Sequence, residues 1–171
     1  MPTVTIKALN KVFDARPDRI DLRDREYQPN LVSLEEQSPD PEVIVKFLPE
    51  YTKYELVLDQ GAEGSCTGFG LAAVINFLLW KRVLDREGTP GQITSVSPRM
   101  LYQMARIYDE WPGEDYEGSS CRGAIKGWHK HGVCARAMWK YIVEKDGRAT
   151  RVVWKDPEPG YLADAATRPV G

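Results

Sequence analysis

One cysteine in this sequence stands where a catalytic nucleophile would stand. Cys66 follows the glycine-rich turn at residues 59–65, DQGAEGS, and directly precedes a long apolar run. The first turn of a helix has unpaired N–H groups and the positive end of the helix dipole, which favour a thiolate over a thiol. Nearby glycines let a substrate approach the backbone closely. The spacing is equally compatible with a small buried hydrophobic residue, which is what most free cysteines are.

Gln60, six positions earlier, has the chemistry of an oxyanion donor. When a thiolate attacks a carbonyl, the oxygen becomes negatively charged and needs hydrogen-bond donors. The side-chain amide of Gln60 and the backbone N–H of Cys66 are a suitable pair, provided that the turn between them folds back on itself. Alone, a glutamine before a glycine is an ordinary surface turn residue, so the hypothesis depends on the pair.

The apolar run after the cysteine predicts a long helix. Apolar side chains cover nearly every helical face from Phe69 to Leu84, and charge is confined to the end of the run. Gly88 and then Pro90 end the pattern. We therefore expect a central helix that is buried on most sides. No uncharged apolar stretch reaches about eighteen residues, so we expect no membrane span.

Two further helices are predicted downstream. Ser97 is a good N-cap, Pro98 fits the first helical position, and the apolar stripe that follows extends to Tyr108. The next helix is predicted from about Cys121 to His131, with Gly132 as its C-terminal cap.

The other segments give weaker signals. Residues 54–61 read as a short strand that runs into a turn, and residues 161–169 favour a short last helix. Residues 137–147 and 150–160 are typical of loops with short extended pieces. The loop around 109–118 is dense in glycine and acid but lacks the spacing of a calcium loop.

Residues 1–54 differ in composition from residues 55–171, which we take as the body. The first segment is rich in charge and proline, and we predict an extended arm that lies against the body, although a mobile tail fits the composition equally well. The argument for docking rests on periodic apolar residues, namely Ile20, Leu22, Tyr27 and Leu31.

Composition limits the class of protein and its partners. The chain has 171 residues, 42% of them hydrophobic and 28% charged, which is ordinary for one globular domain. A net charge of −2 provides no broad basic surface, so we expect neither a nucleic-acid partner nor an anionic membrane. The N-terminus lacks the apolar core of a signal peptide, and we expect a cytoplasmic protein.

The cysteines do not predict a metal centre. There are three cysteines, so at most one disulfide forms. None of them makes a C-x-x-C pair, which weakens the case for a zinc or redox site. A metal site built from Cys121, a histidine and Cys134 fits no familiar zinc spacing, and a Cys121–Cys134 disulfide has little support in a cytoplasmic setting. We expect no cofactor.

Taken together, these segments resemble papain-like cysteine peptidases. The pattern Q-x-x-x-G-S-C at residues 60–66 resembles the family's active-site segment, and DQGxxGSCTGFGLA resembles its bacterial and archaeal branch. In the same order as in the family, SPRMLYQMAR resembles the second helix of the left lobe, EGSSCRGAIKGWHKHGVC the substrate-wall loop and its helix, and PDRIDLRD the lead-in to the mature enzyme. The resemblance implies an α+β fold with a mainly helical left lobe around a long buried central helix.

The resemblance also implies roles for individual residues. Cys66 would be the nucleophile, and Gln60 would donate to the oxyanion together with the Cys66 N–H. Gly118 and Ser119 would pair with an extended peptide or protein substrate, and Ser120 would lie at the neighbouring side-chain pocket.

Three positions depart from the family pattern. Ser119 replaces the second of two glycines, Thr67 replaces the aromatic residue that commonly follows the nucleophile, and Glu63 occupies the place of a disulfide cysteine.

Two catalytic groups of the family have no match here. A papain-like site needs a histidine to pair with the thiolate and an asparagine to orient it, both in a β-rich right lobe. No G-H-A or N-S-W-G motif occurs, and Gly171 comes only 105 positions (171 − 66) after Cys66. We expect the left lobe of a longer enzyme, with the right lobe as its missing partner and little activity alone. His129 and His131 fall where the family carries no catalytic group, so we predict structural or solvent roles.

Two alternatives remain. The chain is also compatible with a catalytically inactive papain-like module that binds or regulates a partner. A cell-wall amidase of the same broad fold would place a histidine on a strand soon after the cysteine helix, and no histidine follows there.

Overall fold

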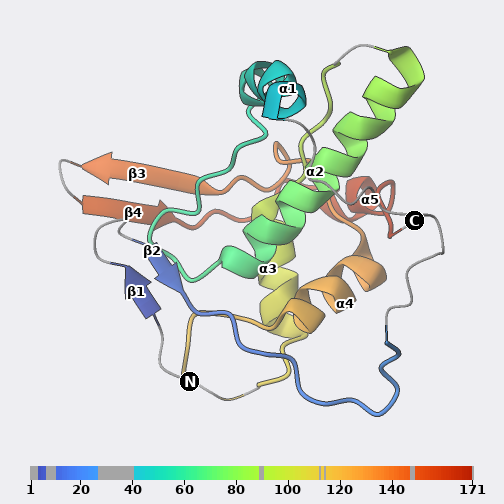
Figure 1. Ribbon diagram of the computed structural model, residues 1–171. Helices are drawn as coiled ribbons and strands as arrows, with labels where there is room; N and C mark the ends of the chain where they lie inside the picture. Colours follow the sequence, from blue (N-terminus) through green and yellow to red (C-terminus); the bar gives the residue numbers. More distant parts are fainter. Residues whose placement is uncertain are drawn as a thin grey trace.

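The computed structural model describes residues 4–6, 11–26, 41–88, 91–111, 113, 115–146 and 149–170. Their helices and strands follow the chain in the order β1 (Val4–Ile6), β2 (Lys11–Phe13), α1 (Pro41–Lys53), α2 (Cys66–Glu87), α3 (Pro98–Ile107), α4 (Cys121–His131), β3 (Ile142–Asp146), β4 (Ala149–Val153) and α5 (Tyr161–Ala165). Figure 1 shows the long helix α2 crossing the molecule above α3 and α4, with the hairpin β3–β4 to one side. This mixture of helices and small sheets agrees with the predicted α+β class.

Glycines let α3 pack closely against its two neighbours. A Cβ added to Gly68 on α2 would lie 2.6 Å from the Cβ of Tyr102, and a Cβ added to Gly127 on α4 would lie 2.6 Å from the Cβ of Met104. Only glycine permits backbones this close. The core between these helices consists of two clusters, one of Ala72, Ile75, Val96, Leu101 and Val133 and one of Met100, Met104, Cys134, Trp139 and Ala165.

The helix ends follow the local sequence signals. The Ser97 hydroxyl caps α3 by accepting the N–H of Met100, with Pro98 in the first turn. Gly88 ends α2 in the left-handed conformation, at φ 68°, and Gly132 ends α4 at φ 68°. These three predicted boundaries are confirmed.

The helix α2 is less enclosed than its sequence predicts. One face remains open, with exposed fractions of 53% for Val74, 46% for Phe77 and 45% for Leu78. Within the described part of the chain, α2 is long and apolar enough to cross a membrane. The core helix of a soluble protein meets the same criteria, so this is weak evidence for a membrane span. The sequence criterion required an uninterrupted stretch of uncharged residues, and the charged residues near the end of α2 exclude it by that criterion.

Both small sheets are antiparallel hairpins. β1 pairs with β2 from Val4 opposite Phe13 to Ile6 opposite Lys11, and β3 pairs with β4 from Ile142 opposite Val153 to Asp146 opposite Ala149. Residues 137–160, expected as loops with extended pieces, therefore contain a regular hairpin.

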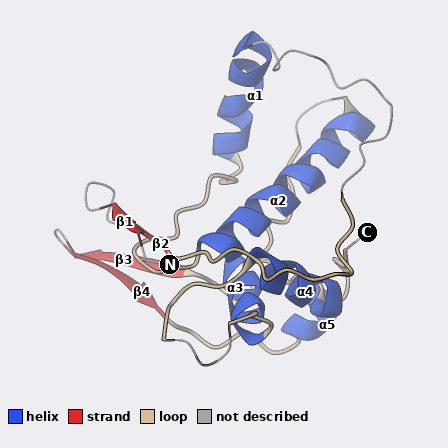
Figure 2. Cartoon of the chain, turned by 60° about the horizontal axis from the view of Figure 1, so that its bottom comes forward, coloured by secondary structure: helices blue, strands red, loops and turns tan. Residues whose placement is uncertain are grey.

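The N-terminal segment contains more structure than expected. Residues 41–53 form α1, which stands apart from α3 and α4 in Figure 2 and meets α2 through an edge-on contact of the Tyr51 and Trp80 rings. The strand predicted at 54–61 is wrong, since a turn and irregular backbone connect α1 to α2. The prediction that apolar side chains dock the arm is also wrong for the two described residues, because Ile20 and Leu22 are 95% and 98% exposed. Tyr27 and Leu31 lie outside the described residues.

Candidate active site

The nucleophile candidate lies at the very start of α2. Cys66 is the first residue of the helix and is partly exposed, while Ser65 before it is fully buried. The first helical hydrogen bond joins the N–H of Phe69 to the carbonyl of Ser65, at 3.1 Å. The N–H of Cys66 therefore belongs to the unpaired first turn, where the helix dipole favours negative charge.

The preceding residues form a tight loop, residues 59–66, which we call the nucleophile loop. Gly61 turns the chain with φ 65°, and its N–H donates to the Asp59 carboxylate at 3.0 Å. The Gln60 side-chain amide donates to the Glu63 carbonyl at 2.9 Å. The N–H of Gly64 donates to the Glu117 carboxylate at 3.4 Å. The loop therefore folds back on itself, and the Glu63 carbonyl holds the Gln60 amide.

The predicted substrate-binding residues lie beside the start of α2. The hydroxyls of Thr67 and Ser119 are 2.5 Å apart, which joins the two segments directly. Gly118, Ser119 and Ser120 are all buried. The Ser120 hydroxyl accepts the N–H of Gly123 at 3.1 Å and caps α4. Its side chain therefore serves the helix in this structure.

The N-terminal arm covers these residues. A Cβ on Gly118 would lie 1.5 Å from the carbonyl oxygen of Asp14, so the arm passes where any side chain would be. The N–H of Gly118 donates to the buried Asp14 carboxylate at 3.3 Å, and Arg16 forms a parallel bridge with Ser120. Residues 14–16 thus lie along the segment that the family resemblance assigns to substrate.

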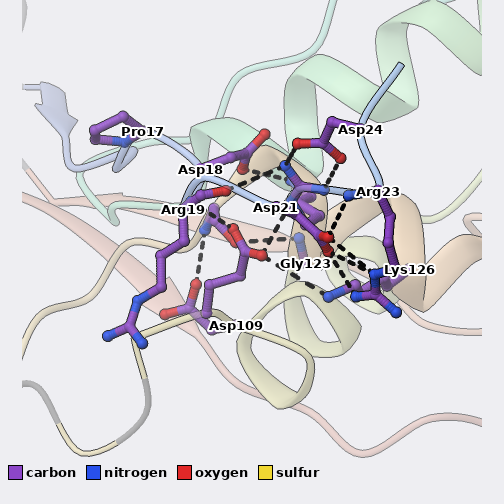
Figure 3. A network of polar contacts seen from close by, with 12 residues as sticks. Pro17, Asp18, Arg19, Asp21, Arg23, Asp24, Asp109, Gly123 and Lys126 are labelled. Carbon is purple, nitrogen blue, oxygen red and sulfur yellow. Dashed lines mark hydrogen bonds and ion pairs between the residues drawn. The ribbon is translucent and has the colours of Figure 1, made fainter.

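Charged groups hold the next part of the arm, as Figure 3 shows. The Arg122 guanidinium donates to both oxygens of Asp24, at 2.6 and 2.7 Å, and its backbone N–H donates to Asp18 at 2.9 Å. Glu110 pairs with Arg122 at 3.0 Å and accepts the N–H of Arg19 at 3.0 Å. The hydrogen bond from Arg122 lowers the pKa of the Asp24 carboxyl. We call residues 14–24 the docked arm.

Two aromatic residues of the acidic loop contact the docked arm. The Arg16 guanidinium lies 4.2 Å from the centre of the Tyr116 ring, and that of Arg19 lies 4.3 Å from the Trp111 ring. Cation–π contacts of this kind favour arginine over lysine. The arm is therefore attached to the body through charged groups and aromatic rings, whereas the sequence predicted that buried apolar side chains would attach it.

The contacts of the histidine, cysteine and metal-site candidates are those of the helical body. The Tyr108 hydroxyl lies 2.7 Å from the Nε2 atom of His131, and both belong to the helical body. All three cysteines are free, and burial raises the pKa of Cys134 to about 11. Among the described residues, no three His, Cys, Asp or Glu side chains gather in a group that could hold a metal.

Sequence reasoning missed a charged cluster that contacts the nucleophile loop. Arg99 on α3 pairs with Glu63 at 3.1 Å, and the Tyr141 hydroxyl donates to the same carboxylate at 2.7 Å. Arg99 is 1% exposed and Tyr141 9%. The only available signal was Glu63 itself, a charge at a position where the family often has a disulfide.

Comparison with solved structures gives one informative similarity. The chain resembles xylellain, described as a cysteine protease from Xylella fastidiosa, with 26% sequence identity and a TM-score of 0.60 over 92% of this chain. The match covers 56% of the xylellain chain. No protein-family model matches the sequence, and no curated protein matches it. The similarity supports the papain-like fold that the motifs predicted.

Proposed function

We propose that this chain carries the nucleophile of a cysteine peptidase. The supporting observation is the position of Cys66, partly exposed at the first residue of α2 with Gln60 in the loop that leads to it. The similarity to a cysteine protease supports the same class of reaction. In the reaction, the Cys66 thiolate attacks a peptide carbonyl, the tetrahedral intermediate releases the amine, and water hydrolyses the resulting thioester.

The oxyanion of the intermediate would face two donors. These are the Gln60 amide and the N–H of Cys66, which belongs to the unpaired first turn of α2. The substrate in this proposal is a peptide or protein in extended form. It would lie along Gly118 and Ser119, in place of residues 14–16, which occupy that segment in this structure.

The base that activates the thiol is proposed to lie outside these residues. His129 and His131 are both on α4, and His131 is bonded to Tyr108. The chain matches little more than half of xylellain. We propose that the described body is the left lobe, that the histidine and asparagine belong to a right lobe, and that residues 1–171 alone have little turnover.

The experiment compares residues 1–171 with the polypeptide translated from the complete reading frame that contains them. Each is assayed on a fluorogenic peptide and labelled with a peptidyl epoxide, and the labelled residue is found by mass spectrometry. We expect turnover in the complete polypeptide and labelling of Cys66. The matched controls are Cys66→Ala, which should abolish both, and Cys121→Ser, which should change neither. Turnover that survives Cys66→Ala refutes the proposal.

The alternative is a catalytically inactive binding module, which one observation favours. The docked arm already fills the predicted substrate-binding segment through Asp14 and Gly118. For such a module, the peptide assay and the labelling of Cys66 would both be negative even after the docked arm is removed.

A further inference from the structure

The Tyr141 hydroxyl joins three separate points of the nucleophile loop. It lies 2.8 Å from the carbonyl oxygen of Gln60, 2.7 Å from the Glu63 carboxylate and 3.1 Å from the hydroxyl of Ser65. A phenol has one hydrogen to donate, and its oxygen accepts in return. The donated hydrogen is therefore shared between Gln60 and Glu63, while Ser65 donates to the phenol oxygen.

Burial fixes Tyr141 in this role. Its ring packs edge-on against Phe69 of α2, with the ring centres 4.7 Å apart. Burial is the largest cause that raises the pKa of its hydroxyl well above the ordinary range, and the hydrogen bond to Glu63 raises it further. Tyr141 therefore stays protonated and remains a donor throughout the pH range of ordinary assays.

The Glu63 carboxylate is also held by Arg99. One guanidinium nitrogen lies 3.1 and 3.3 Å from the two carboxylate oxygens, and the guanidinium also lies over the ring of Trp154. Burial lowers the pKa of Arg99, while Glu63 opposes that shift. Two other guanidinium nitrogens, Nε and Nη2, are buried and have no hydrogen-bond partner among the described residues. Arg99 is thus committed to this one carboxylate.

We propose that Glu63, Arg99 and Tyr141 are positioning residues for the oxyanion donors. This inference rests on the proposed function. The Gln60 side chain is held by the Glu63 carbonyl and its own carbonyl by Tyr141, so this cluster determines where the amide points. Helix α3, through Arg99, thereby fixes the loop in a place where the family often has a disulfide.

Geometry is the main contribution that such a cluster can make. A buried ion pair adds little net stability, because the desolvation of both charges offsets their attraction. Catalysis, by contrast, is sensitive to position: a displacement of about 1 Å costs roughly 100-fold, and the loss of one oxyanion donor costs about 100- to 1,000-fold in rate. The proposal therefore predicts an effect on acyl transfer that exceeds the effect on thiol reactivity.

Two reactions of Cys66 separate these effects without requiring turnover. With p-nitrophenyl acetate, the thiolate attacks the ester carbonyl, an S–C bond forms, and p-nitrophenolate leaves through an oxyanion intermediate. With iodoacetamide, the S–C bond forms as iodide leaves, and no oxyanion arises. The ratio of the two rate constants therefore reports on the oxyanion donors. All proteins carry Cys121→Ser, since Cys121 is exposed, whereas Cys134 is fully buried.

Tyr141→Phe is the principal variant, because it keeps the ring against Phe69 and removes only the hydroxyl. We expect the acylation-to-alkylation ratio to fall about 10- to 100-fold. Glu63→Gln should lower it similarly, and Arg99→Lys, which keeps the charge, should restore part of the ratio lost in Arg99→Met. Tyr108→Phe removes a hydroxyl that contacts His131 on the body and is the matched control, with an unchanged ratio.

Amide hydrogen exchange tests the positioning itself. In Tyr141→Phe, the amides of residues 60–66 should exchange faster than in the parent, while those of α4 keep their rates. An unchanged ratio, or unchanged exchange in the nucleophile loop, overturns the inference. If Cys66 in the complete polypeptide is acylated no faster than a free thiol, the proposed function fails instead, and hydrogen exchange alone decides whether the cluster holds the loop.

Discussion

Charged side chains hold two segments of this molecule in opposite surroundings. In the nucleophile loop, Glu63 and Arg99 are 10% and 1% exposed. In the docked arm, Asp24 is 49% exposed and its partner Arg122 20%. Exposed pairs are screened by water and salt and contribute about 0–1 kcal/mol each, whereas breaking a buried pair costs several kcal/mol. We therefore expect the Glu63–Arg99 pair to cost more to break than the Asp24–Arg122 pair.

The largest effect should come from breaking the buried pair. Arg99→Met leaves Glu63 without its counter-charge, and we expect the free energy of unfolding to fall by about 3–5 kcal/mol. Urea unfolding followed by tryptophan fluorescence measures it. The double variant Glu63→Leu/Arg99→Met should recover most of the loss, since it removes both charges. A loss below about 1 kcal/mol in the single variant would contradict the contrast between the two segments.

A smaller effect should follow from forcing the docked arm off its segment. Gly118→Ala places a methyl group against the Asp14 carbonyl. We expect the free energy of unfolding to fall by about 1–3 kcal/mol and tryptic cleavage after Arg19 to become faster. The matched control is Gly70→Ala, because a Cβ there has nothing within 4 Å and lies in a helix. That control should gain up to about 1 kcal/mol. Equal behaviour of the two variants would show that the arm does not depend on Gly118.

Removing the charge at Arg122, whose partner Asp24 is half exposed, should have a weaker effect that depends on salt. We expect Arg122→Gln to release the docked arm at low ionic strength, because the ion pair with Asp24 is lost. The difference from the parent should disappear near 1 M salt, where the screening length is about 3 Å. Tryptic cleavage after Arg19 reports on release. Lys81→Gln, which removes an exposed pair with Asp85, serves as the control and should leave the arm unchanged.

The smallest effect is expected from acid. The hydrogen bond from Arg122 holds the pKa of Asp24 below its ordinary value of 3.8 in the folded protein. The stabilisation is therefore complete above that ordinary value and is lost as the pH falls through the lowered one. An NMR titration of the arm amides should show release only in this range. Release at neutral pH would show that Asp24 does not hold the arm.

Sequence alone predicted the features that depend on local chemistry. Ser97 with Pro98, and the glycines at 88 and 132, mark helix ends because caps need particular side chains or φ values, and the structure has these boundaries. The apolar run gave the position of α2 but overstated its burial, since periodicity cannot show whether anything covers Phe77.

Contacts between distant segments were beyond the reach of local patterns. The pairing of Glu63 with Arg99 joins residues 36 positions apart, and Tyr141 lies 78 positions from Glu63. A buried arginine cannot be distinguished by pattern from a solvated one. The arm was expected to dock through Ile20 and Leu22, yet these are exposed, because the attachment depends on partners on α4 and the acidic loop.

The close approach of Asp14 to Gly118 has a consequence for competition. Because both residues belong to one chain, residues 14–16 compete with a free peptide intramolecularly, at an effective concentration that the connecting chain determines. A free peptide directed to the same residues must exceed that concentration or bind more tightly than residues 14–16 do. The apparent affinity of residues 118–120 for such a peptide therefore depends on the covalent connection of residues 14–16 as well as on the peptide's own contacts.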